Sequence, residues 1–406
     1  MIQRYMTTHK GKILVIRHHE KLLALLLRDN QILSAQVMEE IKHAVGHIHV
    51  GKVQSISENI GAAFIDLGGG YLTFLPLAEV SQARLTNRRP DGSLKVGDEL
   101  LVQISKEPIK TKLAGVTTKL SLAGQYSVVS LRGKGRASGV QVSSKLDGAA
   151  RLRLQNTEAL TEIAERYRLI VRTNAGGLTD TAPLIQEARE LSAVMDRILE
   201  TGPYRTCYSC LYEGKPNYIT FIENAYRSEY DEVITDLPEI YDGLFAYCAQ
   251  SGIPLRLYED ALLPLYKLYS TEARLQELMD KKVWLKSGGY LVIEPTEALI
   301  SIDVNTGKYE SGKEKEETYY RINKEAAKMI AIHLRARNLS GMILIDFINM
   351  KDRKREQELL QYMQELLKQD PVPARAHDMT PLGLMELTRK KTAPSLARQL
   401  SSQKGV

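Results

Sequence analysis

The sequence has few cysteines and no long hydrophobic segment, and each absence excludes a class of protein. Only 3 of its 406 residues are cysteine, too few for the disulfide framework of small secreted proteins. No run of about 18 apolar residues occurs, so we expect no membrane span. The N-terminus mixes polar and basic residues and lacks the hydrophobic region of a signal peptide. These features predict a cytoplasmic protein.

Two of the cysteines, Cys207 and Cys210, form an isolated CxxC pair. A tetrahedral zinc site has four ligands, and the neighbouring sequence supplies neither a second CxxC nor a pair of histidines. Three interpretations remain open: ordinary thiols, half of a metal site that a second subunit completes, or a redox pair.

Length and charge set further limits. A chain of 406 residues exceeds what one hydrophobic core usually supports, so we expect two to four structural units. The net charge of +6 is modest, but a mildly basic chain suits a polyanionic partner.

The N-terminal part has the pattern of short strands. Residues 11–37 form apolar runs of strand length, interrupted by a charged turn and by Asp29-Asn30. Residues 47–105 contain about five short alternating segments, with three glycines between two of them, where a tight turn requires positive φ. This pattern predicts a small β-barrel.

The middle of the chain mixes strands and helices. Residues 119–175 favour β-structure, interrupted by a helix at 156–168 and followed by a strand that leads to Arg172. Residues 179–201 are typical of an amphipathic helix with Pro183 in its first turn. The other elements expected are a tyrosine-rich strand at 216–222 and helices near 239–251 and 270–280.

The last part begins with a hairpin over residues 283–305 that turns at Ser287-Gly288-Gly289. A long helix at 317–338 follows, and then an apolar strand at 342–348. Strand, helix and strand in this order predict a sheet with a covering helix.

Acidic residues occur on both strands of that predicted sheet. Alternation places Asp303 and Asn305 on the same face of their strand. Asp346 follows four apolar residues, so its side chain should emerge near the end of a buried strand. Two carboxylates and an amide are suitable oxygen ligands for hydrated Mg²⁺. Alternatively, Asp303 caps the turn that follows it, and Asp346 pairs with a basic residue on the helix.

Aromatic and basic residues in the predicted barrel indicate nucleic-acid binding. Phe64 precedes the three glycines, and Tyr71 and Phe74 follow them, so a hairpin would place aromatic rings on neighbouring strands. OB-folds use this arrangement to stack bases, although barrel aromatics also serve as core. Basic residues follow the barrel: Lys106, Lys110, Lys112, Lys119, Arg132, Lys134 and Arg136.

Taken together, five segments, two of them from one catalytic core, resemble the ribonuclease E/G family, in the same order as in that family. HVGKVQSISENIGAAFIDLGGGYLTFLPL is similar to its S1-type OB domain, and RTNAGG to its 5′-sensor strand. ISIDVNTGKY and LSGMILIDFINMKDRKRE are similar to its catalytic core, and DMTPLGLMELTRKK to its terminal basic motif.

The resemblance implies a mixed α+β and α/β chain of several subdomains. A ribonuclease-H-like subdomain is interrupted by an S1-type OB-fold and a 5′-sensor, and a deoxyribonuclease-I-like catalytic subdomain follows. The implied boundaries are 1–44 for the first ribonuclease-H-like part, 45–120 for the OB-fold, 121–204 for the sensor, 205–280 for the second ribonuclease-H-like part and 281–406 for the catalytic subdomain.

The resemblance also implies the reaction. Asp303 and Asp346 would bind Mg²⁺, with Mn²⁺ as a substitute, while Asn305 orients Asp303. Water would attack a phosphodiester of single-stranded, A/U-rich RNA and leave 5′-phosphate and 3′-hydroxyl ends. The implied roles are ribosomal RNA processing and messenger RNA decay.

Further residues match the family's RNA contacts. Those that would hold RNA near the scissile bond are Phe64, Phe74 and Lys112. Those of the 5′-monophosphate pocket are Gly124, Val128, Arg172 and Thr173, whose guanidinium and hydroxyl donors suit a terminal phosphate. A further sensor arginine has no counterpart, and Lys145 is the nearest candidate.

Two family features have no match in this sequence. A CPxC motif through which two subunits share zinc is absent, and so is a small dimerisation domain. We therefore expect a short form without zinc, and a homodimer remains open. Two rival functions also remain: an RNA-binding protein that uses the OB domain without catalysis, and a nuclease that acts on DNA.

Overall fold

The structure, a computed structural model, forms two compact units. Unit 1 comprises residues 1–39 and 227–406, and unit 2 comprises residues 40–226. None of the helices that the structure describes combines the length and the apolar character that a membrane crossing requires. The described ranges are 11–38, 43–108, 112–132, 139–307 and 315–401.

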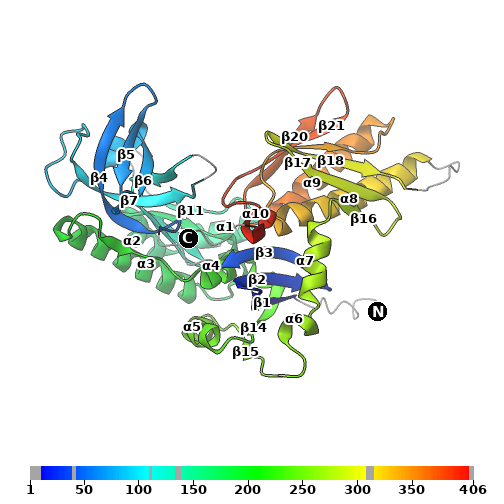
Figure 1. Cartoon of the computed structure of the whole chain (residues 1–406), viewed down its shortest axis with the longest axis horizontal. Helices are drawn as coiled ribbons and strands as arrows, with labels where there is room; N and C mark the ends of the chain where they lie inside the picture. Colours follow the sequence, from blue (N-terminus) through cyan, green and yellow to red (C-terminus); the bar gives the residue numbers. More distant parts are fainter. Residues whose placement is uncertain (1–10, 39–42, 109–111, 133–138, 308–314, 402–406) are drawn as a thin grey trace. The chain divides into compact units, whose positions relative to one another are not determined.

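Unit 1 contains a five-stranded mixed sheet with the order β15-β14-β1-β2-β3 (Figure 1). Antiparallel hairpins join β1 to β2 and β2 to β3, whereas β14 and β15 are parallel to β1. Asp29 and Asn30 both have positive φ, which matches the twist of a tight hairpin and confirms the predicted turn. The strands are β1 (Gly11–His18), β2 (Lys21–Arg28), β3 (Gln31–Met38), β14 (Tyr230–Thr235) and β15 (Leu255–Leu257).

The second sheet of unit 1 has six strands in the order β16-β17-β18-β19-β21-β20. The predicted hairpin, long helix and apolar strand correspond to β16 to β18, α8 and β19. The strands are β16 (Lys282–Trp284), β17 (Tyr290–Pro295), β18 (Leu299–Asn305), β19 (Gly341–Asp346), β20 (Ala374–Met379) and β21 (Leu384–Arg389). The helices of unit 1 are η4 (Arg227–Glu229), α5 (Pro238–Gln250), α6 (Leu265–Leu268), α7 (Thr271–Met279), α8 (Lys315–Ala336), α9 (Arg353–Lys368) and α10 (Leu396–Ser401).

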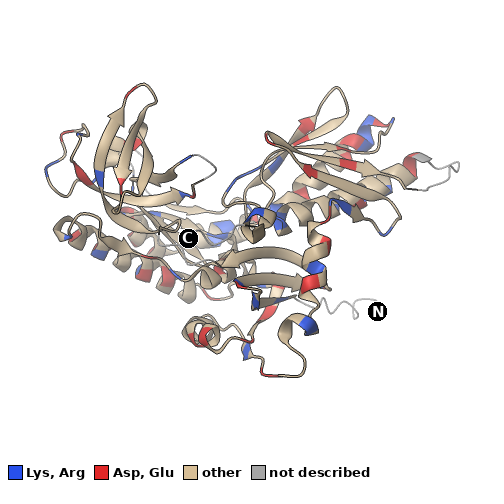
Figure 2. Ribbon diagram, in the orientation of Figure 1, with Lys and Arg blue, Asp and Glu red and all other residues tan. Residues whose placement is uncertain are grey.

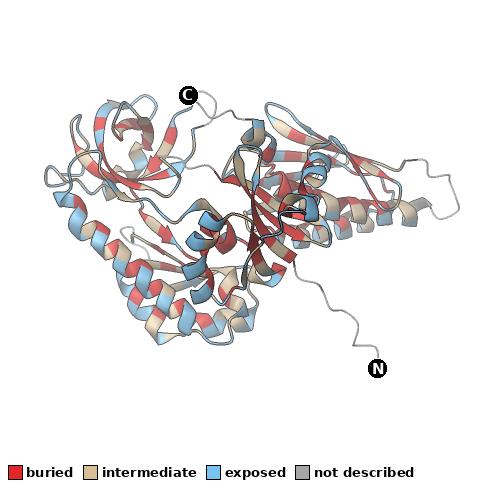
Figure 3. Cartoon of the chain, turned by 60° about the horizontal axis from the view of Figure 1, so that its bottom comes forward, coloured by how far each residue is buried: buried red, intermediate tan, exposed pale blue. Residues whose placement is uncertain are grey.

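Buried residues alternate with more exposed ones along strands such as β18 and β19, so one face of this sheet is buried (Figure 3). Ile302, Val304 and Ile345 belong to a core that also contains Ala326 of α8 and Met363 of α9. Burying an aliphatic side chain of this size contributes about 1.5–3 kcal/mol. The residues that alternate with these therefore face away from the two helices.

Unit 2 begins with a closed barrel, as predicted. Its strands follow the order β4-β5-β6-β8-β7, and β4 also pairs with β7. Positive φ at Gly68, Gly69 and Gly70 forms the expected turn before β6. The barrel elements are β4 (Ile48–Ser57), β5 (Ala62–Asp66), β6 (Leu72–Pro76), η1 (Leu77–Gln82), β7 (Glu99–Lys106) and β8 (Ala114–Thr117). A sixth strand, β13 (Cys210–Tyr212), pairs with β4.

A four-stranded sheet of order β11-β12-β10-β9 completes unit 2 together with its helices. Helix α3 packs its apolar side, including Leu184 and Leu191, into the core of this sheet. The sheet strands are β9 (Ser121–Ala123), β10 (Ser127–Ser130), β11 (Val140–Val142) and β12 (Arg168–Val171). The helices are α1 (Gly148–Gln155), α2 (Glu158–Arg166), η2 (Thr173–Gly177), α3 (Ala182–Thr201), η3 (Gly202–Tyr204) and α4 (Asn217–Asn224).

The tyrosine-rich strand predicted at 216–222 is wrong. These residues lie in α4, which begins after the N-cap residue Pro216. Ile219, Ile222 and Glu223 are buried at helical spacing, so burial of one helical face overrides the β propensity of the aromatic and β-branched residues.

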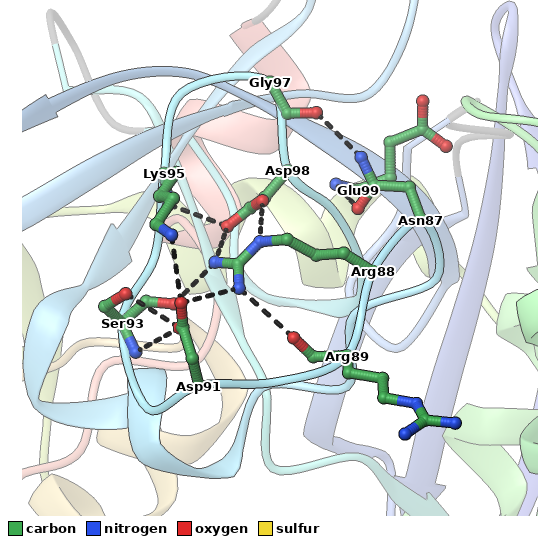
Figure 4. A network of polar contacts seen from close by, with 9 residues as sticks. All are labelled: Asn87, Arg88, Arg89, Asp91, Ser93, Lys95, Gly97, Asp98 and Glu99. Carbon is green, nitrogen blue, oxygen red and sulfur yellow. Dashed lines mark hydrogen bonds and ion pairs between the residues drawn. The ribbon is translucent and has the colours of Figure 1, made fainter.

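A polar network fixes the loop before β7 of the barrel (Figure 4). The Arg88 guanidinium donates to both carboxylate oxygens of Asp98, at 2.6 and 2.7 Å. Asp98 is 4% exposed and also accepts from the backbone N–H of Lys95 at 2.7 Å. The hydrogen bond from Arg88 holds the pKa of Asp98 below its ordinary value. This ion pair therefore stabilises the loop.

We predict that Arg88→Met lowers the free energy of unfolding at pH 7 by about 1–3 kcal/mol, the usual loss for a hydrogen bond to a charged group. Because the pKa of Asp98 is depressed in the folded state, its stabilising contribution is complete above about pH 4 and is lost at lower pH. Denaturant titrations at several pH values should show the variant approaching wild type as the pH falls.

Arg89→Met is the matched control, because the Arg89 side chain points away from the network (Figure 4). It should leave stability within about 0.5 kcal/mol of wild type. An Arg88→Met deficit that stays constant down to pH 3 would contradict the ionic contribution of Asp98.

Candidate functional site

The two acidic residues singled out from the sequence lie side by side in unit 1. Strands β18 and β19 are parallel neighbours, and Asp303 is the register partner of Asp346. Neighbouring strands lie about 4.8 Å apart, and paired residues project from the same face. Both side chains are exposed, on the sheet face opposite α8 and α9.

Asn305 lies two residues further along β18 and contacts Asp303 directly. Its amide N–H donates to Oδ2 of Asp303 at 2.6 Å, as expected if both side chains point the same way. This bond occupies one carboxylate oxygen and restricts rotation of the group. The other oxygen of Asp303 is thereby directed away from Asn305.

The alternative interpretation of these residues lacks support among the residues that the structure describes. Neither Asp303 nor Asp346 forms an ion pair there with a basic side chain of α8 or any other element. Two carboxylates on adjacent strands repel each other, so a cation between them would be favourable. The donor set consists of hard oxygens, the ligand type that Mg²⁺ prefers.

An aromatic group that the sequence did not reveal lies on the same sheet face. Trp284 is the register partner of Tyr290, and Tyr290 is the register partner of Asn305. Lys282 pairs with Val292, which in turn pairs with Asp303. Trp284 is 62% exposed. The Lys282 ammonium lies 4.0 Å from the centroid of the Trp284 ring and 3.8 Å from the centroid of the Tyr290 ring. Alternation of Val283 and Leu285 with polar or aromatic neighbours could have indicated this group.

In the barrel, the predicted pairing of aromatic residues is present. Phe64 and Phe74 are register partners on β5 and β6, with ring centroids 6.4 Å apart in an edge-to-face arrangement. Both are half-buried and Lys112 is exposed. Tyr71 instead stacks on His43, with a centroid distance of 4.2 Å.

Two of the described basic residues near the barrel have partners of their own. Lys119 forms an ion pair with Glu79 at 3.0 Å, and Arg132 donates to the carbonyl of Glu165. Basic and acidic residues are interspersed in both units (Figure 2), so charge alone does not locate a path for a polyanion. Three basic residues fall outside the described ranges: Lys110, Lys134 and Arg136.

Two of the four sensor candidates are in direct contact. The Arg172 guanidinium donates to the carbonyl oxygen of Gly124, and to Oδ1 of Asn224 at 2.7 Å. The Thr173 hydroxyl instead lies 2.9 Å from that of Ser143. Val128 is half-buried and is paired with Ile170 between β10 and β12. The structure therefore brings Arg172 and Gly124 together and gives Thr173 a different partner.

Arg172 also lines a pocket of about 380 Å³ together with Lys215 and Glu223. Burial raises the pKa of Glu223, while its ion pair with Lys215 lowers that pKa to a smaller extent. Lys145, the candidate for the missing arginine, donates to the hydroxyl of Tyr226 at 3.1 Å.

Glu187 is a residue of this region that the sequence did not reveal. Its carboxylate, on α3, accepts hydrogen bonds of 2.7–2.9 Å from the backbone N–H groups of Gln125, Tyr126 and Ser127. A Cβ at position 124 would lie 2.4–2.7 Å from this carboxyl group, so a larger residue there would displace the Glu187 carboxylate. Three converging N–H groups form an anion-binding loop, and Glu187 occupies it.

Comparison with known proteins relates the chain to one family. The model of the ribonuclease E/G family matches residues 121–392, and that of the S1 RNA binding domain matches residues 42–112. Ribonuclease G of Salmonella typhimurium (strain SL1344) is 31% identical over 375 residues, covering 88% of this chain and 75% of that protein. Ribonuclease E of Escherichia coli (strain K12) is 31% identical over 86% of this chain and 34% of its own length. A putative ribonuclease E of Buchnera aphidicola subsp. Baizongia pistaciae (strain Bp) is 30% identical over 91% of this chain and 92% of that protein.

Proposed function

Because the chain belongs to the ribonuclease E/G family, we propose that it is an Mg²⁺-dependent endoribonuclease that cuts single-stranded, A/U-rich RNA. The observation that supports the metal-dependent chemistry is the register of Asp303 with Asp346 on parallel strands. It places two carboxylates on one exposed face without a described basic partner, which suits a hydrated cation.

In this proposal, Asp303 and Asp346 hold the cation and Asn305 keeps the Asp303 carboxylate in its orientation through the 2.6 Å hydrogen bond. Bound there, Mg²⁺ would act as a Lewis acid that polarises a phosphoryl oxygen and lowers the pKa of a water molecule. Water attacks phosphorus as the P–O3′ bond breaks, and the 3′ oxygen takes up a proton. The products carry a 5′-phosphate and a 3′-hydroxyl.

The substrate contacts divide between the two units. In unit 1, Trp284 and Tyr290 offer aromatic surface on the face that carries the carboxylates, and bases stack on such rings without strong sequence preference. In unit 2, Phe64 and Phe74 provide a second pair of rings and Lys112 an exposed charge for the phosphate backbone.

The sensor assignment is part of the same proposal. Arg172 and Thr173 would bind a terminal 5′-monophosphate beside Gly124 and Val128. The support is the position of Arg172, which lies against Gly124 and lines a pocket. Hydrogen bonds to the Gly124 carbonyl and to Asn224 hold the guanidinium in place beside this pocket, where its charge would attract a phosphate.

We also propose the finer fold relationships. The order β3-β2-β1-β14-β15, with an antiparallel meander followed by two parallel strands, supports a ribonuclease-H-like subdomain into which unit 2 is inserted. The six-stranded sheet with α8 and α9 on one face supports a deoxyribonuclease-I-like subdomain. Cytoplasmic ribosomal RNA processing and messenger RNA decay remain predictions from the family resemblance.

We predict that Asp303→Asn and Asp346→Asn each lower RNA cleavage about 1,000-fold or more. A metal ion supplies several kcal/mol of transition-state stabilisation, and each 1.36 kcal/mol corresponds to a factor of ten. The measurement is cleavage of a 5′-monophosphorylated single-stranded RNA with Mg²⁺, Mn²⁺ or EDTA, beside the affinity for the same RNA.

Glu294→Gln is the matched control, because Glu294 is an exposed carboxylate on the same sheet face and pairs with Ser301 in β18. It should retain nearly full activity. Wild type that binds RNA but cuts it with neither metal would instead support the RNA-binding protein without catalysis. Equal cleavage of a matched DNA oligonucleotide would support the DNA nuclease.

We predict that Trp284→Ala weakens RNA binding by about 1–3 kcal/mol, the usual value of stacking one base on an aromatic side chain. Phe245→Ala is the control, since Phe245 is 58% exposed on α5, outside the six-stranded sheet. Trp284 is the only tryptophan of the chain, so RNA should also quench the intrinsic fluorescence directly. Unchanged affinity and unchanged fluorescence would exclude Trp284 from the RNA path.

We predict that Arg172→Ala removes the faster cleavage of 5′-monophosphate over 5′-hydroxyl substrates while basal cleavage persists. The reason is that only the first kind of substrate carries a terminal phosphate for Arg172 to bind. Arg168→Ala on β12, which removes a guanidinium bound to Gln141, should leave the preference intact. Rates on both substrates provide the test. Equal losses for Arg172→Ala on the two substrates would make Arg172 structural.

A further inference from the structure

Cys210 lies beside two histidines that are far from it in the sequence. Strand β13 pairs with β4 so that Cys210 is the register partner of His49. His47 lies two residues before His49, and alternation places both imidazoles on the face that Cys210 shares. One ligand atom from each of the three side chains lies within 4.8 Å of the other two.

His49 provides an independent reason to expect a ligand here. Its side chain is 3% exposed, and neither ring nitrogen has a hydrogen-bond partner among the residues that the structure describes. Leaving a buried polar group unsatisfied costs about 1–3 kcal/mol, so such a group usually has a function. Burial, with smaller contributions from His43 and His47, lowers the pKa of His49 to about 4.

The backbone around the three residues is fixed by hydrogen bonds. The N–H of Tyr208 donates to the carbonyl of Val50 at 2.7 Å, and the N–H of Val50 donates to that of Ser209 at 3.0 Å. The Cys210 thiol donates weakly to the carbonyl of Tyr212 at 3.5 Å, and Cys210 is exposed. The cluster is therefore held in place and can be reached from solvent.

We propose that His47, His49 and Cys210 form a binding site for Zn²⁺. Imidazole nitrogens and thiolate sulfurs are both ligand types that Zn²⁺ binds, with bonds of about 2.0–2.3 Å and ligand atoms roughly 3.5 Å apart in a tetrahedral site. Small side-chain rotations close the present spacing, and a water completes the tetrahedron. The thiol loses its proton on binding.

The metal would cross-link β13 to β4 and so stabilise the pairing of the segment that follows α3 with the barrel. This role differs from the proposed Mg²⁺ chemistry in unit 1 and does not depend on it. It also gives Cys210 a function that Cys207 does not share, since Cys207 lies outside the three-ligand cluster. The expectation of a chain without zinc rested on the missing CPxC motif and on the lack of further ligands near the CxxC pair in sequence, and neither considers the distant residues His47 and His49.

The test uses the full chain after removal of metal with a chelator. Zn²⁺ affinity is measured by competition with a chromophoric chelator, and Co²⁺ is added separately as a spectroscopic probe. We expect one tight Zn²⁺ per chain, a thiolate-to-cobalt charge-transfer band, and a rise in Tm of roughly 5 °C at a hundredfold excess of Zn²⁺ over Kd.

Cys210→Ser and His49→Gln should each weaken Zn²⁺ binding at least about 100-fold, more than the usual effect of changing a neighbour of a ligand. Cys210→Ser should also abolish the cobalt band. Cys207→Ser is the matched control and should change neither measurement. Cys210 is an exposed residue, so its variant should remain folded.

Another group of possible ligands among the described residues, His18, His19 and Glu272, contains no sulfur and cannot produce the charge-transfer band. Tight binding that survives Cys210→Ser would overturn the proposal. So would an equal loss in Cys207→Ser, which would indicate that the two thiols bind the metal as a pair.

Discussion

The parallel pairing of β18 with β19 is the constraint on which the catalytic proposal depends. Side chains alternate along each strand, so the register that pairs Asp303 with Asp346 also directs Ile302 and Ile345 toward the core under α8 and α9. A shift by one residue would bury a carboxylate and expose an aliphatic side chain, at a cost of several kcal/mol. The same core that stabilises unit 1 therefore selects the one arrangement in which the two acidic residues share an exposed face. Asn305, Tyr290 and Trp284 are placed on that face by the same alternation.

Unit 2 contributes the proposed binding surfaces rather than the acidic pair, and strand pairing forms two of them. The β5–β6 hairpin places Phe64 opposite Phe74. Glu187 of α3 binds the N–H groups that precede β10, which fixes the loop against which Arg172 packs. Strand β13 adds Cys210 to the edge of β4. The register of paired strands brings together Phe64 with Phe74 and Cys210 with His49, whereas Glu187 reaches its loop from a helix through side-chain hydrogen bonds.

The sequence predicted what depends on local pattern. Alternation in 300–305 and the apolar run before Asp346 were enough to predict the strands and the faces of their acidic residues, and the three glycines predicted the barrel turn. Patterns failed where tertiary burial decides, as in α4, where aromatic and β-branched residues form a helix because one helical face is buried. Helix α9 was missed because its charged residues obscure the buried spacing of Leu359, Met363 and Leu367. The contacts of Glu187, and those of Cys210 with His47 and His49, are long-range pairings that no local spacing encodes.

The central claim is that Asp303 and Asp346 together hold one cation, and cleavage of the polypeptide by bound Fe²⁺ tests it most directly. Fe²⁺ that replaces Mg²⁺ generates hydroxyl radicals with peroxide and ascorbate, and these radicals cut the backbone close to the metal. The account predicts cuts on both strands, near residues 303–305 and near 346–349, that excess Mg²⁺ suppresses together. Cuts near only one of the two aspartates, or cuts that do not respond to Mg²⁺, would contradict it.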